Sequence, residues 1–213
     1  MACPICNKRK PERYCPAKGE KICAVCCGTE REVTIDCPAD CAYLVAAHRY
    51  EEEHRKPVPP AAVPFPDVEF SSDLVHEHRA VVSGLGYAIL KFAAAQPALV
   101  DADALAALAA LAETYRTLRS GIYYEKPPAA ALPGGLYDEL SKMIQNFKQQ
   151  EADRAGFTRL NDTEIFYLLV FLLRVGRYHT NGRPRARSFL EFLRTQFPQA
   201  TELARAQSRI ITP

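Results

Sequence analysis

Every cysteine of the 213-residue chain lies within its first forty-one residues. A segment of that size cannot bury enough apolar surface to fold alone, so it needs metal ions or disulfide bonds. The eight thiols that must supply them are Cys3, Cys6, Cys15, Cys23, Cys26, Cys27, Cys37 and Cys41. Two residues separate Cys3 from Cys6 and Cys23 from Cys26, a spacing that lets both thiolates of a pair bind one tetrahedral zinc ion. The pattern therefore predicts a zinc-binding segment.

Eight cysteines make two complete sets of four ligands, so we expect two zinc ions. The two closely spaced pairs each look like half of one site, which assigns them to the first ion. The second ion then takes the remaining thiols, which are Cys15, Cys27, Cys37 and Cys41. Pro38 is expected at the first position of a helix, with Cys37 at its cap and Cys41 about one turn later.

His48 is the main alternative ligand. On a continuous helix it lies about 10 Å of rise beyond Cys41, which is too far to share that cysteine's zinc ion. It can serve the other ion, so whether His48 replaces Cys27 as a ligand stays open.

The spacing of the first five ligands is Cys3-x2-Cys6-x8-Cys15-x7-Cys23-x2-Cys26, with Tyr14 and Ile22 directly before the third and fourth. In this the segment resembles the cross-braced B-box fingers of animal ubiquitin-ligase proteins. The later spacing, Cys37-x3-Cys41-x6-His48, is more similar to the MYND and HIT-type fingers, which end on a short helix. The resemblance spans residues 3–48 and implies two zinc ions and the binding of another protein, without ligase activity.

An even number of cysteines in a small segment can also form a disulfide framework, but such frameworks are typical of secreted proteins. The chain starts Met-Ala-Cys-Pro, with neither a basic start nor an apolar signal core. The longest apolar run, residues 165–173, is shorter than the roughly twenty residues of a membrane span. We therefore expect a soluble, cytoplasmic protein with reduced thiols and no membrane partner.

Composition supports a folded remainder, because 48% of the residues are hydrophobic. A helix is expected from Pro38 to about Arg55, and five prolines follow in residues 57–66. Such a segment forms a stiff spacer, or an ordered arm with Val63 and Phe65 packed against the rest. We divide the chain into a two-zinc finger over residues 1–56, a proline-rich linker over 57–70 and a helical domain over 71–213.

Beyond the linker, apolar residues recur every three or four positions, which is typical of amphipathic helices. Ser71 or Ser72 is expected to cap a first helix reaching Phe92, and Asp101 or Asp103 opens a second that ends near Gly121. A loop with Pro133, Gly134 and Gly135 precedes a third helix over residues 136–155.

Asn161 and Glu164 form a predicted capping box for a fourth helix, which runs to about Tyr178. This helix is apolar nearly all round and belongs at the centre. A last helix carries Phe189 to Phe197, and a short segment continues through Leu203 and Ile210. We predict a mainly α protein, with the zinc finger followed by an all-helical bundle of about five helices.

Positive charge is concentrated at the end of the fourth helix and just after it, where residues 174–187 contain five arginines and no acid. Residues 57–170 carry a net charge of −5 and residues 171–213 a net charge of +6. The two segments either neutralise each other across the fold or leave the arginines for an anionic partner. In the second case the possible nucleic-acid contacts are Arg177, Arg183, Arg185 and Arg187.

Known catalytic motifs are absent from the sequence, which has no nucleophile elbow, phosphate loop or His-Glu-x-x-His pattern. A zinc ion held by four thiolates has no free position for a substrate. We therefore expect no enzymatic activity and no small-molecule substrate. Two functions remain: the finger binds another protein, or the finger and the arginines together bind nucleic acid, with Lys8, Arg9, Lys10 and Arg13 contributing.

Overall fold

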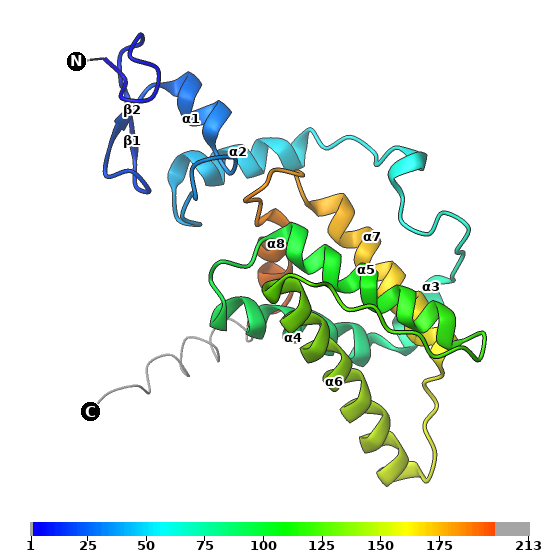
Figure 1. Cartoon of the computed structure of the whole chain (residues 1–213). Helices are drawn as coiled ribbons and strands as arrows, with labels where there is room; N and C mark the ends of the chain where they lie inside the picture. The colour runs from blue at the N-terminus through cyan, green and yellow to red at the C-terminus, as the bar shows by residue number, and fades with distance from the viewer. Residues whose placement is uncertain (1, 199–213) are drawn as a thin grey trace, which may run out of the picture.

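The computed structural model describes residues 2–198, and Figure 1 shows a small N-terminal finger attached to one end of a helical bundle. The last predicted segment, through Leu203 and Ile210, lies outside the described residues. The elements of the finger are β1 (Arg13–Cys15), β2 (Glu20–Ile22), α1 (Ala24–Glu30) and α2 (Ala42–Glu53). The finger therefore holds the only sheet of the described chain, and the mainly α fold class is confirmed.

Strands β1 and β2 form an antiparallel hairpin in which Arg13 pairs with Ile22 and Cys15 with Glu20. Gly19 closes its turn at φ 68°, in the left-handed region that favours glycine, and its N–H donates to the carbonyl of Cys15. Among the described residues, the core around the cysteines holds only two buried aliphatic side chains, those of Ile22 and Ile35. So small a core cannot stabilise the finger without further cross-links.

Helix α2 starts later than the sequence analysis predicted. Residues 37–40 form a turn in which the N–H of Cys41 donates to the carbonyl of Pro38 at 3.0 Å, and the helix begins at Ala42. Cys41, rather than Cys37, is therefore the N-cap. A proline fits this turn as well as it fits a first helical turn, because both require its fixed φ.

The proline-rich segment between α2 and the bundle is an ordered arm in its second half. Phe65 packs edge-on against the ring of Phe166, with the ring centroids 5.4 Å apart. The guanidinium of Arg174 donates to the carbonyl oxygens of Pro64, Phe65 and Val68. In Figure 1 the arm arches from the end of α2 over to the far end of α7.

Six helices follow the arm within the described residues, one more than predicted. Their bounds are α3 (Ser72–Glu77), α4 (Arg79–Ala95), α5 (Asp101–Leu118), α6 (Ala131–Ala155), α7 (Asp162–His179) and α8 (Ser188–Gln196). The extra helix arises because the predicted first helix breaks at His78, whose N–H still bonds to Leu74. The side chain of Ser71 caps α3, as one of the two predicted alternatives.

Helix α7 lies at the centre of the bundle, as its apolar sequence predicted. It packs against α4, α5 and α8, and Phe166, Leu168 and Leu169 on it are completely buried. Its capping box is also confirmed, since the Asn161 and Glu164 side chains each accept the other's backbone N–H at 2.9 Å. Gly176 allows close approach, because a Cβ there would lie 2.5 Å from a methyl carbon of Leu105.

Helix α6 begins earlier than predicted and contains the three residues that were assigned to a loop. Pro133 is its third residue, and a proline is tolerated there because the first-turn N–H groups have no partner inside the helix. Gly135 faces the ring of Phe92 so closely that a Cβ would lie 3.1 Å from it. None of the helices formed by residues 2–198 combines the length and apolar composition that a membrane crossing requires.

The carboxylate of Asp101 caps a helix distant in sequence, not the one it begins. It is completely buried and accepts the backbone N–H groups of Phe189 and Leu190, at 3.0 and 3.2 Å, in the first turn of α8. The start of α5 is instead capped by Asp103, whose carboxylate accepts the N–H of Val100 at 3.2 Å. Asp101 thus joins the starts of α5 and α8.

Replacing Asp101 with alanine is expected to lower the free energy of unfolding by about 2–4 kcal/mol, because two buried N–H groups lose their acceptor. The matched control is Asp103→Ala, which removes a more exposed cap and is expected to cost about 1 kcal/mol. Urea unfolding followed by circular dichroism measures both. Equal losses of unfolding free energy in the two variants would show that the buried cap contributes no more stability than the more exposed one.

Candidate metal centre

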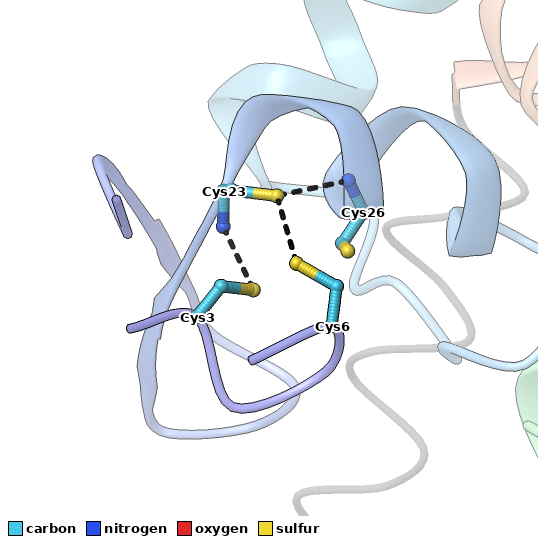
Figure 2. A group of neighbouring side chains, drawn as sticks. All are labelled: Cys3, Cys6, Cys23 and Cys26. Atoms are coloured by element: carbon cyan, nitrogen blue, oxygen red, sulfur yellow. Dashed lines mark hydrogen bonds between the residues drawn. The ribbon is translucent and has the colours of Figure 1, made fainter. Parts of the chain in front are cut away.

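Four cysteines of the finger converge on one point (Figure 2). The sulfur atoms of Cys3, Cys6, Cys23 and Cys26 all lie within 4.8 Å of one another. Cys3 and Cys6 come from the N-terminal loop, Cys23 is the N-cap of α1, and Cys26 lies in the first turn of that helix. The structure therefore brings together the two closely spaced pairs that the sequence assigned to one site.

Backbone geometry holds these sulfur atoms in place. The N–H of Cys23 donates to the sulfur of Cys3 at 3.2 Å, and the N–H of Cys26 donates to the sulfur of Cys23 at 3.4 Å. The N-terminal loop turns back through Asn7, which adopts φ 51°, a conformation that asparagine tolerates better than most residues. Hydrogen bonds from N–H groups stabilise thiolates, so the loop and the start of α1 both prepare anionic sulfur ligands.

The pKa values of two thiols in the cluster are shifted in opposite directions. Backbone hydrogen bonds from Lys8 and Arg9 lower the pKa of Cys6 to about 6, so it ionises readily. Burial, together with hydrogen bonds to the neighbouring sulfurs, raises the pKa of Cys26 to about 12. The raised pKa of Cys26 keeps that thiol protonated at neutral pH unless a cation binds beside it. A cation that binds there must release protons, as thiolate sites do when they take up metal.

The size of the cluster suits a tetrahedral metal ion. Four thiolates at the usual zinc–sulfur distance of about 2.3 Å stand about 3.8 Å apart, and the sulfurs of Cys6 and Cys23 are 4.0 Å apart. All eight cysteines of the chain are free thiols, and so are available as ligands. A site of four thiolates holds the ion on all sides and has no position for a substrate.

The other four cysteines are less closely gathered. Cys15 and Cys41 are buried and Cys27 and Cys37 are half-buried. Burial raises the pKa of Cys37, and the nearby thiols of Cys41 and Cys15 add to the rise, so these three are neighbours. Within residues 2–198, no second group of three or more ligating side chains is as close as the first cluster. The second zinc site thus stays a prediction.

His48, the alternative ligand, has another partner. Its Nε2 lies 3.1 Å from both carboxylate oxygens of Glu32. Burial would raise the pKa of Glu32, but hydrogen bonds from His48 and Asn181 outweigh it and hold that pKa below its usual value. Burial would likewise lower the pKa of His48, but Glu32 outweighs it and holds that pKa above its usual value. Both shifts favour the ion pair.

Glu32 is the functional residue that the sequence analysis missed. It is only 2% exposed and adopts φ 54°, which is uncommon for a residue other than glycine. Its carboxylate also accepts from the side chain of Asn181 at 2.8 Å and from the backbone N–H of Arg187 at 3.4 Å. Its backbone carbonyl accepts the N–H of Arg185 at 2.8 Å. One residue of the finger thereby accepts three hydrogen bonds from the α7–α8 loop of the bundle.

Three of the four arginines considered for nucleic acid contact the finger, and one of them also contacts the α4–α5 loop. Arg183 donates to the carbonyls of Gly28 and Arg31, at 3.3 and 2.7 Å. Arg187 pairs with Asp36 and donates to the carbonyls of Pro97 and Leu99, and Arg185 lies 3.8 Å from the same Asp36. Arg177 is exposed on the last turn of α7.

These contacts change the interpretation of the arginine-rich loop. The sequence offered two alternatives, charge neutralisation by the acidic middle segment or an external anion. The structure shows a third, in which Arg183 and Arg187 bind backbone carbonyls and the finger's own Asp36. Every residue has a backbone carbonyl, so the pattern of charged side chains cannot show which carbonyls an arginine binds.

Comparison with known proteins returns no relative: no family model matches the chain, and no curated protein and no solved structure matches it either. The resemblance to B-box, MYND and HIT-type fingers therefore rests on the cysteine spacings alone, and the four-cysteine cluster shows a possible metal site without identifying a family.

Replacing Glu32 with alanine is expected to lower the free energy of unfolding by about 3–5 kcal/mol, because His48 and Asn181 lose a buried, charged partner. Amide hydrogen exchange in residues 180–187 should also rise, since that loop loses its attachment to the finger. The matched control is Glu30→Ala, which removes a half-buried carboxylate bonded only to Thr34, within the finger. If exchange in the loop is equal in both variants, Glu32 does not hold the two parts together.

Proposed function

We propose that the chain is a non-enzymatic zinc protein whose N-terminal finger binds another protein and is carried by the helical bundle. The four-sulfur cluster of Cys3, Cys6, Cys23 and Cys26 is the observation that supports it best. A closed site of this kind serves structure rather than catalysis, and it cross-links a segment whose own core is too small. Recognition is then left to the surface of the finger.

Zinc is the metal that this donor set favours, because four thiolates in a tetrahedron suit it. The second ion of the proposal would be bound by Cys15, Cys27, Cys37 and Cys41. Its support is that all four are free, buried or half-buried thiols of the finger, and that the thiols of Cys41 and Cys15 contribute to raising the pKa of Cys37. His48 is set aside as a ligand because it already bonds to Glu32. Reduced thiols in such a site also suit the cytoplasm.

A protein partner is favoured over nucleic acid by the position of the arginines. Arg183 and Arg187, two of the four possible nucleic-acid contacts, are engaged within the molecule. Lys8, Arg9 and Lys10 are exposed basic residues of the finger and follow the candidate ligand Cys6 closely in sequence. Nucleic-acid binding through these residues and Arg177 stays as the second candidate.

Metal analysis of the purified protein is expected to find about two zinc ions per chain. Cys23→Ser should remove one, Cys41→Ser should remove the other, and His48→Ala should keep both. A strong chelator should unfold the finger and spare most of the helical circular dichroism. If His48→Ala instead loses one whole equivalent while Cys27→Ser loses none, the assignment of the second set is wrong.

The choice between partners is tested by pull-down from a lysate of the native host, with and without nuclease. A protein-binding finger should retain its partners after nuclease treatment and lose them in the Cys23→Ser variant. Partners that disappear with nuclease, together with affinity for mixed RNA or DNA that falls steeply with salt, would favour the nucleic-acid candidate. Capture of nothing under any condition contradicts both.

A further inference from the structure

A groove of about 310 Å³ lies between the start of β1, the end of α1 and helix α2. Its lining is basic on one side and apolar on the other, and consists of Arg13, Arg31, Tyr43, Ala46, Ala47, Tyr50 and Glu51. The apolar members recur at helical spacing on one face of α2. This face is turned away from Leu44 and His48, which face the bundle side of the helix.

The two guanidinium groups of the groove have no carboxylate partner. Within residues 2–198, no carboxylate oxygen lies within 4.0 Å of Arg13 or Arg31. Arg31 is only 9% exposed, and its guanidinium has a single polar contact, the sulfur of Cys27 at 4.0 Å. Arg13 stacks over the ring of Tyr43, 4.9 Å from its centroid. In the proposed second zinc site Cys27 is a thiolate, so Arg31 has a counter-charge beside it. Arg13 has no anionic partner among the described residues and is the cation of the groove that is left for an external anion.

Glu51 does not neutralise these cations, although it lines the same groove. Its carboxylate lies 3.2 Å from the side-chain nitrogen of Asn181, on the side of α2 that faces the bundle. Within the described residues, the positive charge of Arg13 at the other end of the groove thus has no carboxylate partner.

The apolar side of the groove offers contact area at low entropic cost. Tyr50 is 61% exposed, although it is one of the largest side chains of the finger, and its ring stacks on His54 with the centroids 4.0 Å apart. Ala46 and Ala47 beside it leave room for an incoming side chain. Tyrosines held in this way are frequent anchors of protein interfaces.

Charge also selects the class of macromolecule. Glu51, Glu52 and Glu53 follow directly along α2, so a nucleic-acid backbone leaving Arg13 would meet three successive acids. Arg13 covers Tyr43 and His54 covers one face of Tyr50, which leaves little for base stacking. A protein segment needs only one or two carboxylates at Arg13 and an apolar side chain next to them.

We propose that this groove binds an acidic segment of a partner protein, with a carboxylate at Arg13 and a neighbouring apolar side chain against Ala46, Ala47 and Tyr50. The inference rests on the proposed function and deepens it, since it identifies which surface of the finger makes the contact and the chemistry of its partner.

The test is selection of phage-displayed random dodecapeptides on the zinc-loaded full chain at physiological salt. Selected sequences are expected to carry Asp or Glu within two positions of an aliphatic or aromatic residue. Arg13→Glu and Tyr50→Ala should each raise the Kd of the best synthetic peptide at least about tenfold, measured by fluorescence anisotropy.

The matched control is Lys18→Glu, which makes the same charge change at the hairpin turn, at the opposite end of the strand pair from Arg13. It should change the Kd by less than about twofold, because an exposed charge outside the groove is screened. Zinc content and circular dichroism confirm that each variant folds, and Arg13→Gln is the second variant if Arg13→Glu does not.

Three outcomes overturn the proposal: selection that enriches basic or uncharged peptides or none, a peptide Kd that Arg13→Glu and Lys18→Glu change equally, or competition by mixed RNA or DNA in place of peptide. The pull-down separates this failure from that of the proposed function. Host partners that bind the full chain and are retained by Arg13→Glu and Tyr50→Ala would disprove the groove and leave the finger a protein-binding module.

Discussion

The carboxylate of Glu32 is the interaction on which the joining of finger and bundle depends. It lies almost fully buried and takes hydrogen bonds from His48 within the finger and from Asn181 and Arg187 in the bundle. A charge removed from water in this way is stable only while every partner is in place, so the network fixes one relative position of the two parts. The proline-rich arm is then a second connection rather than a hinge, because Arg174 holds its far half against α7.

The arginine-rich loop shows why local charge is a weak guide to partners. Arg183 is surrounded in sequence by other cations, yet its guanidinium bonds to backbone carbonyls of residues more than 150 positions away. Burying those carbonyls without a donor would cost free energy, so the arginine satisfies groups that the sequence does not reveal. A fork of five N–H donors suits carbonyls as well as it suits phosphate.

What the sequence predicted correctly was local. The Asn161–Glu164 capping box and the central position of α7 depend on residues within one helix, and the first cysteine cluster depends on two short spacings. The features that the sequence did not predict are either very short elements or contacts between residues distant in sequence. The hairpin has three residues per strand, too few for a periodicity, and Asp101 caps a helix nearly ninety residues away. Glu32 gave no signal because its partners come together only in the folded chain.

Helix α1 links the metal cluster to this interface. It has seven residues, far fewer than an isolated helix needs in water, so its ends must be held by other parts of the structure. At its start Cys23 and Cys26 belong to the four-sulfur cluster. The carbonyls that receive Arg183 belong to Gly28, within the helix, and to Arg31, at its C-cap. Because one short helix carries both sets of contacts, an ion bound at the cluster also orders the carbonyls that hold the α7–α8 loop, and the finger's surface is presented in one orientation.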